Sequence, residues 1–136
     1  MRSVLALLIG LLVVAHLGFF AAEAILWESN REIRDNLGFT RHAPEEVHEV
    51  AKVGVNQGLC NAFLAAGLAW GFWKYTRGRL EGRPVLIFFL GFIAIAGVVG
   101  YFSINPPALS AKMGFLVGQT GLAVAALIVL LTSPPR

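Results

Sequence analysis

Four long apolar runs divide the chain, and short polar segments separate them. The runs cover about residues 4–27, 53–73, 84–104 and 113–131. Each is close to the ~20 residues that an α-helix needs to cross the hydrocarbon layer of a membrane. Lipid offers no partner for backbone N–H and C=O groups, so such runs form helices there. The pattern predicts an all-α fold, an integral membrane bundle of four transmembrane helices forming one domain over residues 1–136.

The first run has a second interpretation, as a secretory signal. A basic Arg2 precedes it, and Ala22-Glu23-Ala24 has the small-residue pattern of a cleavage site. The apolar run is long for a signal peptide, whose hydrophobic region is usually shorter than a membrane span. We therefore expect it to be a membrane helix.

The first connection, residues 28–52, is the only long one, and it holds six acidic and four basic residues. Within it, Pro44 is followed directly by Glu45 and Glu46. Proline suits the first position of a helix, and acidic side chains favour the positive end of the helix dipole. We therefore expect the second helix to begin near residue 44, outside the membrane, and to enter it near residue 53.

The other two connections are short. The second is basic, and Asn105-Pro106-Pro107 is a tight stop between the third and fourth runs. Positive charge favours the cytoplasmic side of a membrane protein, which places the second connection and both termini in the cytoplasm. Three arginines in the first connection act against this orientation: Arg31, Arg34 and Arg41.

Composition agrees with a small polytopic membrane protein, since 57% of the residues are hydrophobic and 14% are charged. The formal net charge of +3 comes without a basic face interleaved with aromatics, so we expect no nucleic-acid partner. Cys60 is the only cysteine, which excludes an intrachain disulfide. It lies in an apolar run, where we expect it to pack rather than react.

Polar residues inside the runs gather in one half of the predicted bundle. Each run brings them to the membrane half next to the first connection, while the opposite half is almost purely aliphatic. This asymmetry does not depend on the orientation of the protein in the membrane. The polar residues of that half include His16, Glu23, Asn56, Gln57, Asn61, Tyr101 and Gln119.

Helical spacing refines this grouping. His16 and Glu23 are seven residues apart and share one helix face, as do Gln57 and Asn61, which are four apart. Asn56 points elsewhere, to a neighbouring helix or a second copy. Glycines spaced four apart permit close approach of helices within the chain or in a homo-oligomer. These pairs are Gly54 and Gly58, Gly67 and Gly71, and Gly114 and Gly118.

Two interpretations of the polar cluster stand side by side. In the functional one, Glu23 and His16 form a catalytic acid–base pair, and the remaining polar side chains bind a ligand. In the structural one, the amides join helices and His16 bonds a helix carbonyl. We expect no metal and no cofactor, since His16 lacks a second ligand at metal-binding spacing. The predicted ligand-binding residues are Asn56, Gln57, Asn61, Tyr101 and Gln119.

Aromatic residues have simpler interpretations. Trp27 and Trp73 mark the ends of apolar runs, as residues of a membrane-interface belt do. Phe19, Phe20 and Phe63 are expected in the core or facing lipid, with an apolar pocket as the alternative.

Four stretches resemble a family of small bacterial membrane proteins, catalogued as domain of unknown function 1304. NQGLCN, residues 56–61, is similar to the family's NQG-x-YN pattern, and AHLGFFAAEAILW, residues 15–27, to its first helix. DNLGF and AGVVGYFS, at residues 35–39 and 96–103, also resemble it. The resemblance covers nearly the whole chain and implies a four-helix fold in the bacterial cytoplasmic (inner) membrane. It names no activity.

Two positions depart from the family pattern. Cys60 stands where the family often has tyrosine, and Ala15 precedes His16 where a glutamate is expected. If either family residue matters for the chemistry, the chemistry of this chain differs accordingly.

Three classes of function remain open. The favoured one is a membrane enzyme or binding protein for a small apolar molecule. The second is a proton-coupled small-molecule transporter that acts as a dimer. The third is a structural or accessory membrane subunit, in which the polar cluster only holds helices together.

Overall fold

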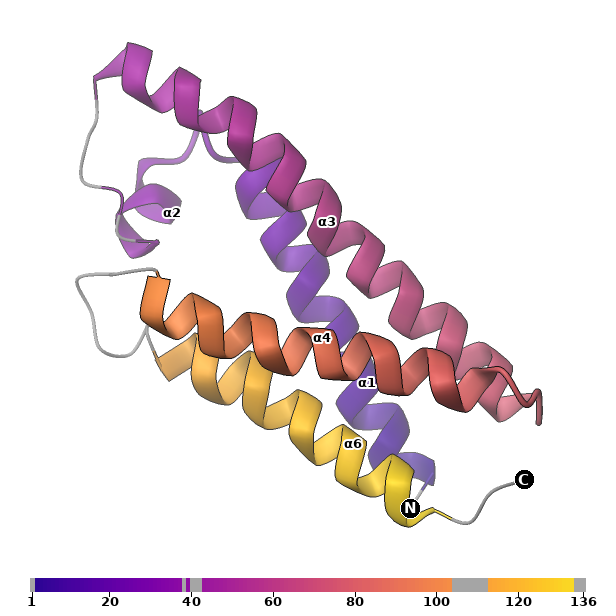
Figure 1. The fold of residues 1–136 in the computed structure, drawn as a ribbon. Helices are drawn as coiled ribbons and strands as arrows, with labels where there is room; N and C mark the ends of the chain where they lie inside the picture. Colours follow the sequence, from indigo (N-terminus) through magenta and orange to yellow (C-terminus); the bar gives the residue numbers. More distant parts are fainter. Residues whose placement is uncertain (1, 38, 40–42, 104–112, 134–136) are drawn as a thin grey trace.

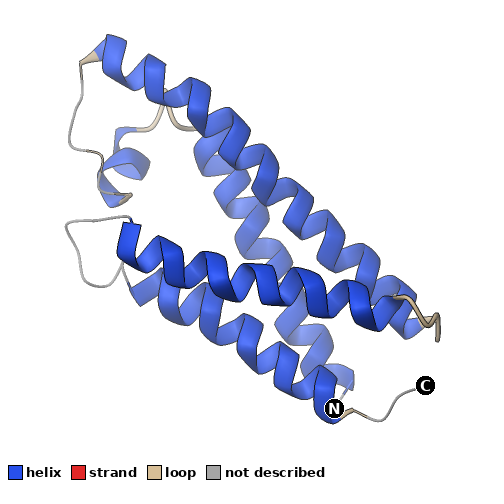
Figure 2. Cartoon of the chain, in the orientation of Figure 1, coloured by secondary structure: helices blue, strands red, loops and turns tan. Residues whose placement is uncertain are grey.

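The computed structural model describes residues 2–37, 39, 43–103 and 113–133. Within these residues the structure is helical and contains no strand (Figure 2). The chain order is α1 (Arg2–Phe20), the π-helix η1 (Ala21–Ile25), α2 (Arg31–Asn36), α3 (Pro44–Thr76), α4 (Gly82–Ser103), the π-helix η2 (Gly114–Gly121) and α6 (Leu122–Thr132). The all-α prediction is confirmed.

Two of the predicted runs form helices that are long and apolar enough to cross a membrane, by length and composition. They are Arg2–Ile25, which joins α1 to η1, and Gly82–Ser103, which is α4. Leu116–Thr132 is a shorter apolar helix. α3 begins at Pro44, as its sequence predicts. Its 33 residues include the apolar run at about residues 53–73, and most of the remainder precedes that run.

An aliphatic core fills one end of the bundle. α1 and α6 both reach this end, which is also the end at which α3 connects to α4 (Figure 1). Arg83, after this connection, donates a hydrogen bond to the Leu131 carbonyl at 3.1 Å. The predicted aliphatic half is thus present as a packed core. Its buried members are Leu5, Ile9, Leu12, Leu68, Leu86, Leu90, Ile93, Ala123, Ala126 and Leu130.

α3 and α4 meet closely at this end and diverge toward the other (Figure 1). Glycines make the close approach possible. A Cβ on Gly82 would lie 2.3 Å from the Tyr75 backbone nitrogen, and one on Gly67 would lie 2.2 Å from the Phe89 ring. Both distances are far shorter than van der Waals contact, so a side chain at Gly82 would push the backbones apart, and one at Gly67 would require the Phe89 ring to move.

The first connection contains a short helix, α2, that the pattern of apolar runs does not predict. Asn30 caps it, and its side-chain oxygen accepts a hydrogen bond from the Ile33 N–H at 3.2 Å. Asparagine is a favoured N-cap residue, so this signal was present in the sequence. The predicted stop at residues 105–107 lies outside the described residues.

Trp27 does not lie in an exposed belt, and that prediction is wrong. It is buried, its ring packs against Phe39 in a tilted arrangement with ring centroids 5.3 Å apart, and its backbone carbonyl accepts a hydrogen bond from Arg34. The folding of the first connection over this ring removes it from the surface. Trp73 is exposed, and the Arg77 guanidinium lies 5.6 Å from its ring centroid.

Candidate functional site

A cavity of about 260 Å³ lies between the helices, beyond the aliphatic core. Five polar residues from α1, η1, α3 and η2 line it: His16, Glu23, Gln57, Asn61 and Gln119. The rest of its wall comes from Phe19, Cys60, Leu64, Phe92, Ala96 and Gly100. The cavity therefore combines an apolar wall with a few convergent polar groups, as small-molecule sites do.

Glu23 and Asn61 join the first helix to α3. Asn61 donates one amide hydrogen to Glu23 Oε2 at 2.9 Å and another to the Gln57 carbonyl at 3.3 Å. Asn61 is buried and Glu23 is half-buried, so the bond lies largely away from the surface. A carboxylate that accepts a hydrogen bond in such a place is stabilised more than an unpaired one would be.

Two glycines of α3 make this bond possible. A Cβ on Gly54 would lie 2.8 Å from the Glu23 carbonyl oxygen, and one on Gly58 would lie 2.8 Å from the Ala24 Cβ. Without side chains at these positions, α3 lies directly against η1. The predicted close approach of helices at this glycine pair is confirmed, and it brings Asn61 within reach of Glu23.

Both π-helices carry a polar residue of the cavity. Glu23 lies in η1 and Gln119 lies in η2. The π-helix is rare, because its i→i+5 hydrogen bonds are less favourable, and it occurs frequently at functional sites. The Thr120 hydroxyl next to Gln119 donates to the Ala94 carbonyl of α4 at 3.0 Å, which fixes η2 against α4.

His16 is fully buried, with 0% of its surface exposed. Its Nδ1 lies 2.8 Å from the Leu12 carbonyl oxygen, and a carbonyl only accepts, so Nδ1 is the donor. In the neutral imidazole Nε2 is then an acceptor, and this buried atom has no hydrogen-bond partner in the structure. A buried polar atom without a partner is uncommon and points to a ligand or water that would complete it.

The structure brings together five of the seven predicted site residues. Asn56 is exposed and does not line the cavity, in agreement with its different helix face. Tyr101 is also absent from the cavity wall, where its neighbour Gly100 lies instead. Depth along the helix was predicted for Tyr101, but depth alone does not fix the direction in which a side chain points.

Six wall residues were not assigned to the site from the sequence, and three of them show why. Cys60 lines the cavity and is exposed, so it is not packed inside the protein as expected, and its low reactivity stays a prediction. Phe19 lines the cavity and contacts His16 edge-on, with ring centroids 6.0 Å apart. Phe92 belongs to α4, whose phase relative to the other helices could not be obtained from its uniformly apolar sequence.

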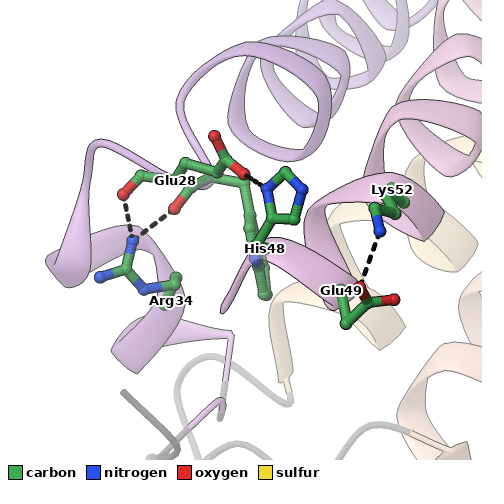
Figure 3. Close-up of polar contacts among 6 residues, drawn as sticks. Glu28, Arg34, His48, Glu49 and Lys52 are labelled. Atoms are coloured by element: carbon green, nitrogen blue, oxygen red, sulfur yellow. Dashed lines mark hydrogen bonds and ion pairs between the residues drawn. The ribbon is translucent and has the colours of Figure 1, made fainter. Parts of the chain in front are cut away.

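A second group of polar contacts lies at the first connection (Figure 3). His48 Nδ1 lies 2.7 Å from Glu28 Oε1, and Arg34 donates to the Glu28 carbonyl at 2.9 Å. Lys52 donates to Glu49 at 2.7 Å, and this bond lowers the pKa of the Glu49 carboxyl below its ordinary value. The His48–Glu28 and Lys52–Glu49 pairs are exposed, so they contribute little to stability.

Metal-ligand side chains do not gather at either place. Among the described residues, no group of three or more histidine, cysteine, aspartate or glutamate residues could hold a metal ion. The cavity itself presents the Glu23 carboxyl and the His16 imidazole, two groups of the kind that can exchange protons, beside an apolar wall.

Comparison with known proteins places the chain in a family without assigning it an activity. No curated protein and no solved structure matches the chain. One family model matches residues 10–131, which is most of the 136-residue chain. The chain therefore belongs to the family described as protein of unknown function (DUF1304).

Proposed function

We propose that the chain is a four-span membrane protein that binds a small, mostly apolar molecule in the cavity between its helices. The outer surface supports the membrane part of this proposal. Large apolar side chains are exposed along α1, α4 and α6, and a soluble monomer rarely shows such a surface. Examples are Leu7, Val14, Phe88, Ile95 and Ile128. The second span would be the part of α3 between about residues 53 and 73.

The unpartnered Nε2 of His16 carries the ligand part of the proposal. It is a buried acceptor on the wall of a cavity that also holds the Glu23 carboxylate. An ammonium group could donate to both acceptors and a hydroxyl to one of them, while the phenyl rings of Phe19 and Phe92 would contact an apolar body. If the molecule is converted rather than only bound, Glu23 and His16 would act as the acid–base pair.

Native mass spectrometry of the protein released from lipid particles tests this proposal. A discrete non-lipid mass is expected on the wild type and absent from folded Glu23→Gln, which keeps the shape of the side chain and removes its charge. Asn56→Leu, on an exposed face of α3 away from the cavity, should retain the mass. Only lipid on all three proteins, with equal stability, would contradict a ligand at Glu23.

Replacing His16 by leucine separates ligand binding from folding. The change removes a buried acceptor that has no partner together with the Nδ1 bond to the Leu12 carbonyl, and the two effects oppose each other, so we expect the free energy of unfolding to change by no more than about 1 kcal/mol. Retention of the ligand should be lost. Reversible unfolding in mixed micelles measures the first quantity, and native mass spectrometry the second. A strongly destabilised His16→Leu protein would instead assign His16 a structural role.

The structural-subunit alternative also has a specific observation in its favour. The Asn61–Glu23 bond joins α3 to η1 and would do so without any ligand. Under this alternative Asn61→Leu would lose stability, and no variant would lose a separate binding property. The transporter alternative has no comparable support, because the packed aliphatic core closes the other half of the bundle.

The orientation with both termini in the cytoplasm of a bacterial inner membrane remains part of the proposal. A homo-oligomer is also part of the proposal. The glycine pairs differ in whether they are free to contact a second copy. The pairs at residues 54 and 58 and at residues 67 and 71 already contact neighbouring helices of the chain. A Cβ on Gly114 or Gly118 would meet nothing within 4 Å, which leaves this pair for a contact between copies.

A further inference from the structure

The cavity reaches from a fully buried inner wall to an exposed edge. His16 and Gln119 are buried, whereas Gln57 and Cys60 of α3 are exposed, and 53% of the surface of Phe92 in α4 is exposed. These exposed residues come from the two helices that diverge from their close contact near Gly82 (Figure 1). The opening of the cavity therefore lies between α3 and α4.

The surface on both sides of this opening is apolar. On α3, Leu59 and Phe63 are exposed, and on α4, Phe88 and Ile95 are exposed. In the four-span arrangement these side chains contact the hydrocarbon of the bilayer, because exposed aliphatic and aromatic groups of this size are favourable there. A molecule that enters between the two helices would therefore come from the lipid and not from water.

The size of the cavity limits what can enter. Its volume is about 260 Å³, and a water-sized group occupies about 30 Å³, so roughly eight or nine non-hydrogen atoms fit. A phospholipid is far too large. A single-chain molecule of this length, or the polar end of a longer one whose tail remains in the bilayer, fits the space.

Resting on the proposed function, we infer that the opening between α3 and α4 admits small lipid-dissolved molecules with a hydroxyl or ammonium head group. A hydroxyl head group donates its single hydrogen to His16 Nε2 at the inner wall, and an ammonium head group donates to His16 Nε2 and to Glu23. The apolar body lies between Phe19 and Phe92 and points out through the opening. This assigns a chemical class to the ligand and a route by which it arrives.

Cys60 provides the test, because it is the only cysteine of the chain and lies in the cavity wall. The full chain is placed in phosphatidylcholine vesicles, and modification of Cys60 is followed by mass. One reagent is a short N-alkylmaleimide that dissolves in lipid, and the other is a sulfonated maleimide that stays in water. Each rate is divided by the rate of the same reagent on the chain unfolded in detergent.

We expect the lipid-soluble reagent to react at least about tenfold faster than the sulfonated one on this normalised scale, because one favours the hydrocarbon and the other is excluded from it. Ala96→Trp fills the cavity wall on α4 and should slow the lipid-soluble reagent by about tenfold through the steric loss of space. Val98→Trp, also exposed on α4 but on a different helix face from Ala96 and outside the cavity wall, is the matched control and should leave the rate unchanged.

Protection of Cys60 tests the ligand class. Octan-1-ol and octylammonium, which carry donors, should slow the lipid-soluble reagent in the wild type and not in His16→Leu. Heptyl methyl ether has the same number of heavy atoms as octan-1-ol and no donor, and it should give no protection. Equal protection by the ether would overturn the assignment of the head group.

The experiments distinguish a wrong entry route from a wrong ligand site. Equal reaction with the sulfonated reagent would show access from water and overturn the lipid route, while protection by the alcohol could still support the site. No reaction of folded protein with either reagent would also overturn the route. Reaction with the lipid-soluble reagent alone, without protection by any donor molecule, would support the opening and contradict the proposed function.

Discussion

Replacing Asn61 by leucine is expected to lower the free energy of unfolding by about 2 kcal/mol, because it leaves the Glu23 carboxylate without its donor. Hydrogen bonds between membrane helices average only about 0.6 kcal/mol and reach about 1.7 kcal/mol. The expected loss exceeds that average because a charged acceptor remains in a largely apolar environment. Reversible unfolding of the full chain in mixed micelles measures this difference.

Asn56→Leu is the matched control for this prediction. It makes the same chemical change five residues earlier in α3, on an exposed face, and should alter the free energy of unfolding by less than about 0.5 kcal/mol. In the double variant Glu23→Leu/Asn61→Leu the stranded carboxylate is gone, so part of the loss should be recovered. An Asn61→Leu protein as stable as the wild type would contradict the importance of the bond.

The polar half of the bundle could be predicted because helical spacing carries that information. His16 and Glu23, seven apart, and Gln57 and Asn61, four apart, indeed face one cavity. Their partners could not be predicted, because the rotation of α3 against the first helix depends on close contact at Gly58. The sequence showed that such a contact was permitted, and only the structure shows which helix makes it.

Other parts of the fold left weaker signals in the sequence. The π-helices η1 and η2 have no composition of their own, so nothing marks them before the backbone is seen. The burial of Trp27 depends on Phe39 and Arg34, which follow in a connection with no apolar periodicity. The cavity-wall residues of α4 could not be predicted either, because the sequence of a helix that is apolar on all sides does not show which face points inward.

The structure also identifies the glycine whose replacement should be most damaging. We expect Gly82→Ala to lower the free energy of unfolding by about 3 kcal/mol, the upper part of the usual range for overpacking. Its Cβ would lie 2.3 Å from the Tyr75 nitrogen and 2.6 Å from the Tyr75 Cα, and backbone atoms cannot rotate away. The start of α4 would have to move away from the end of α3. Unfolding in mixed micelles measures the loss.

Three comparisons show why close approach, and not glycine itself, sets this cost. Gly91→Ala should be neutral or stabilising by up to about 1 kcal/mol, since a Cβ there meets nothing within 4 Å and alanine favours helix. Gly78→Ala should cost only about 1 kcal/mol, because Gly78 has a positive φ of 69° but open space. Gly67→Ala should fall below Gly82→Ala, because the atoms it meets belong to the side chain of Phe89, which can turn.

The same substitution connects the fold to the route proposed for the ligand. α3 and α4 diverge from their contact at Gly82, so a displacement there changes the separation of the two helices at the cavity opening (Figure 1). Gly82→Ala protein that remains folded should therefore react faster at Cys60 with the lipid-soluble maleimide, whereas Gly91→Ala should react at the wild-type rate. An unchanged rate in a destabilised Gly82→Ala protein would mean that the width of the opening is set elsewhere, by the packing of η2 against α4 through Thr120.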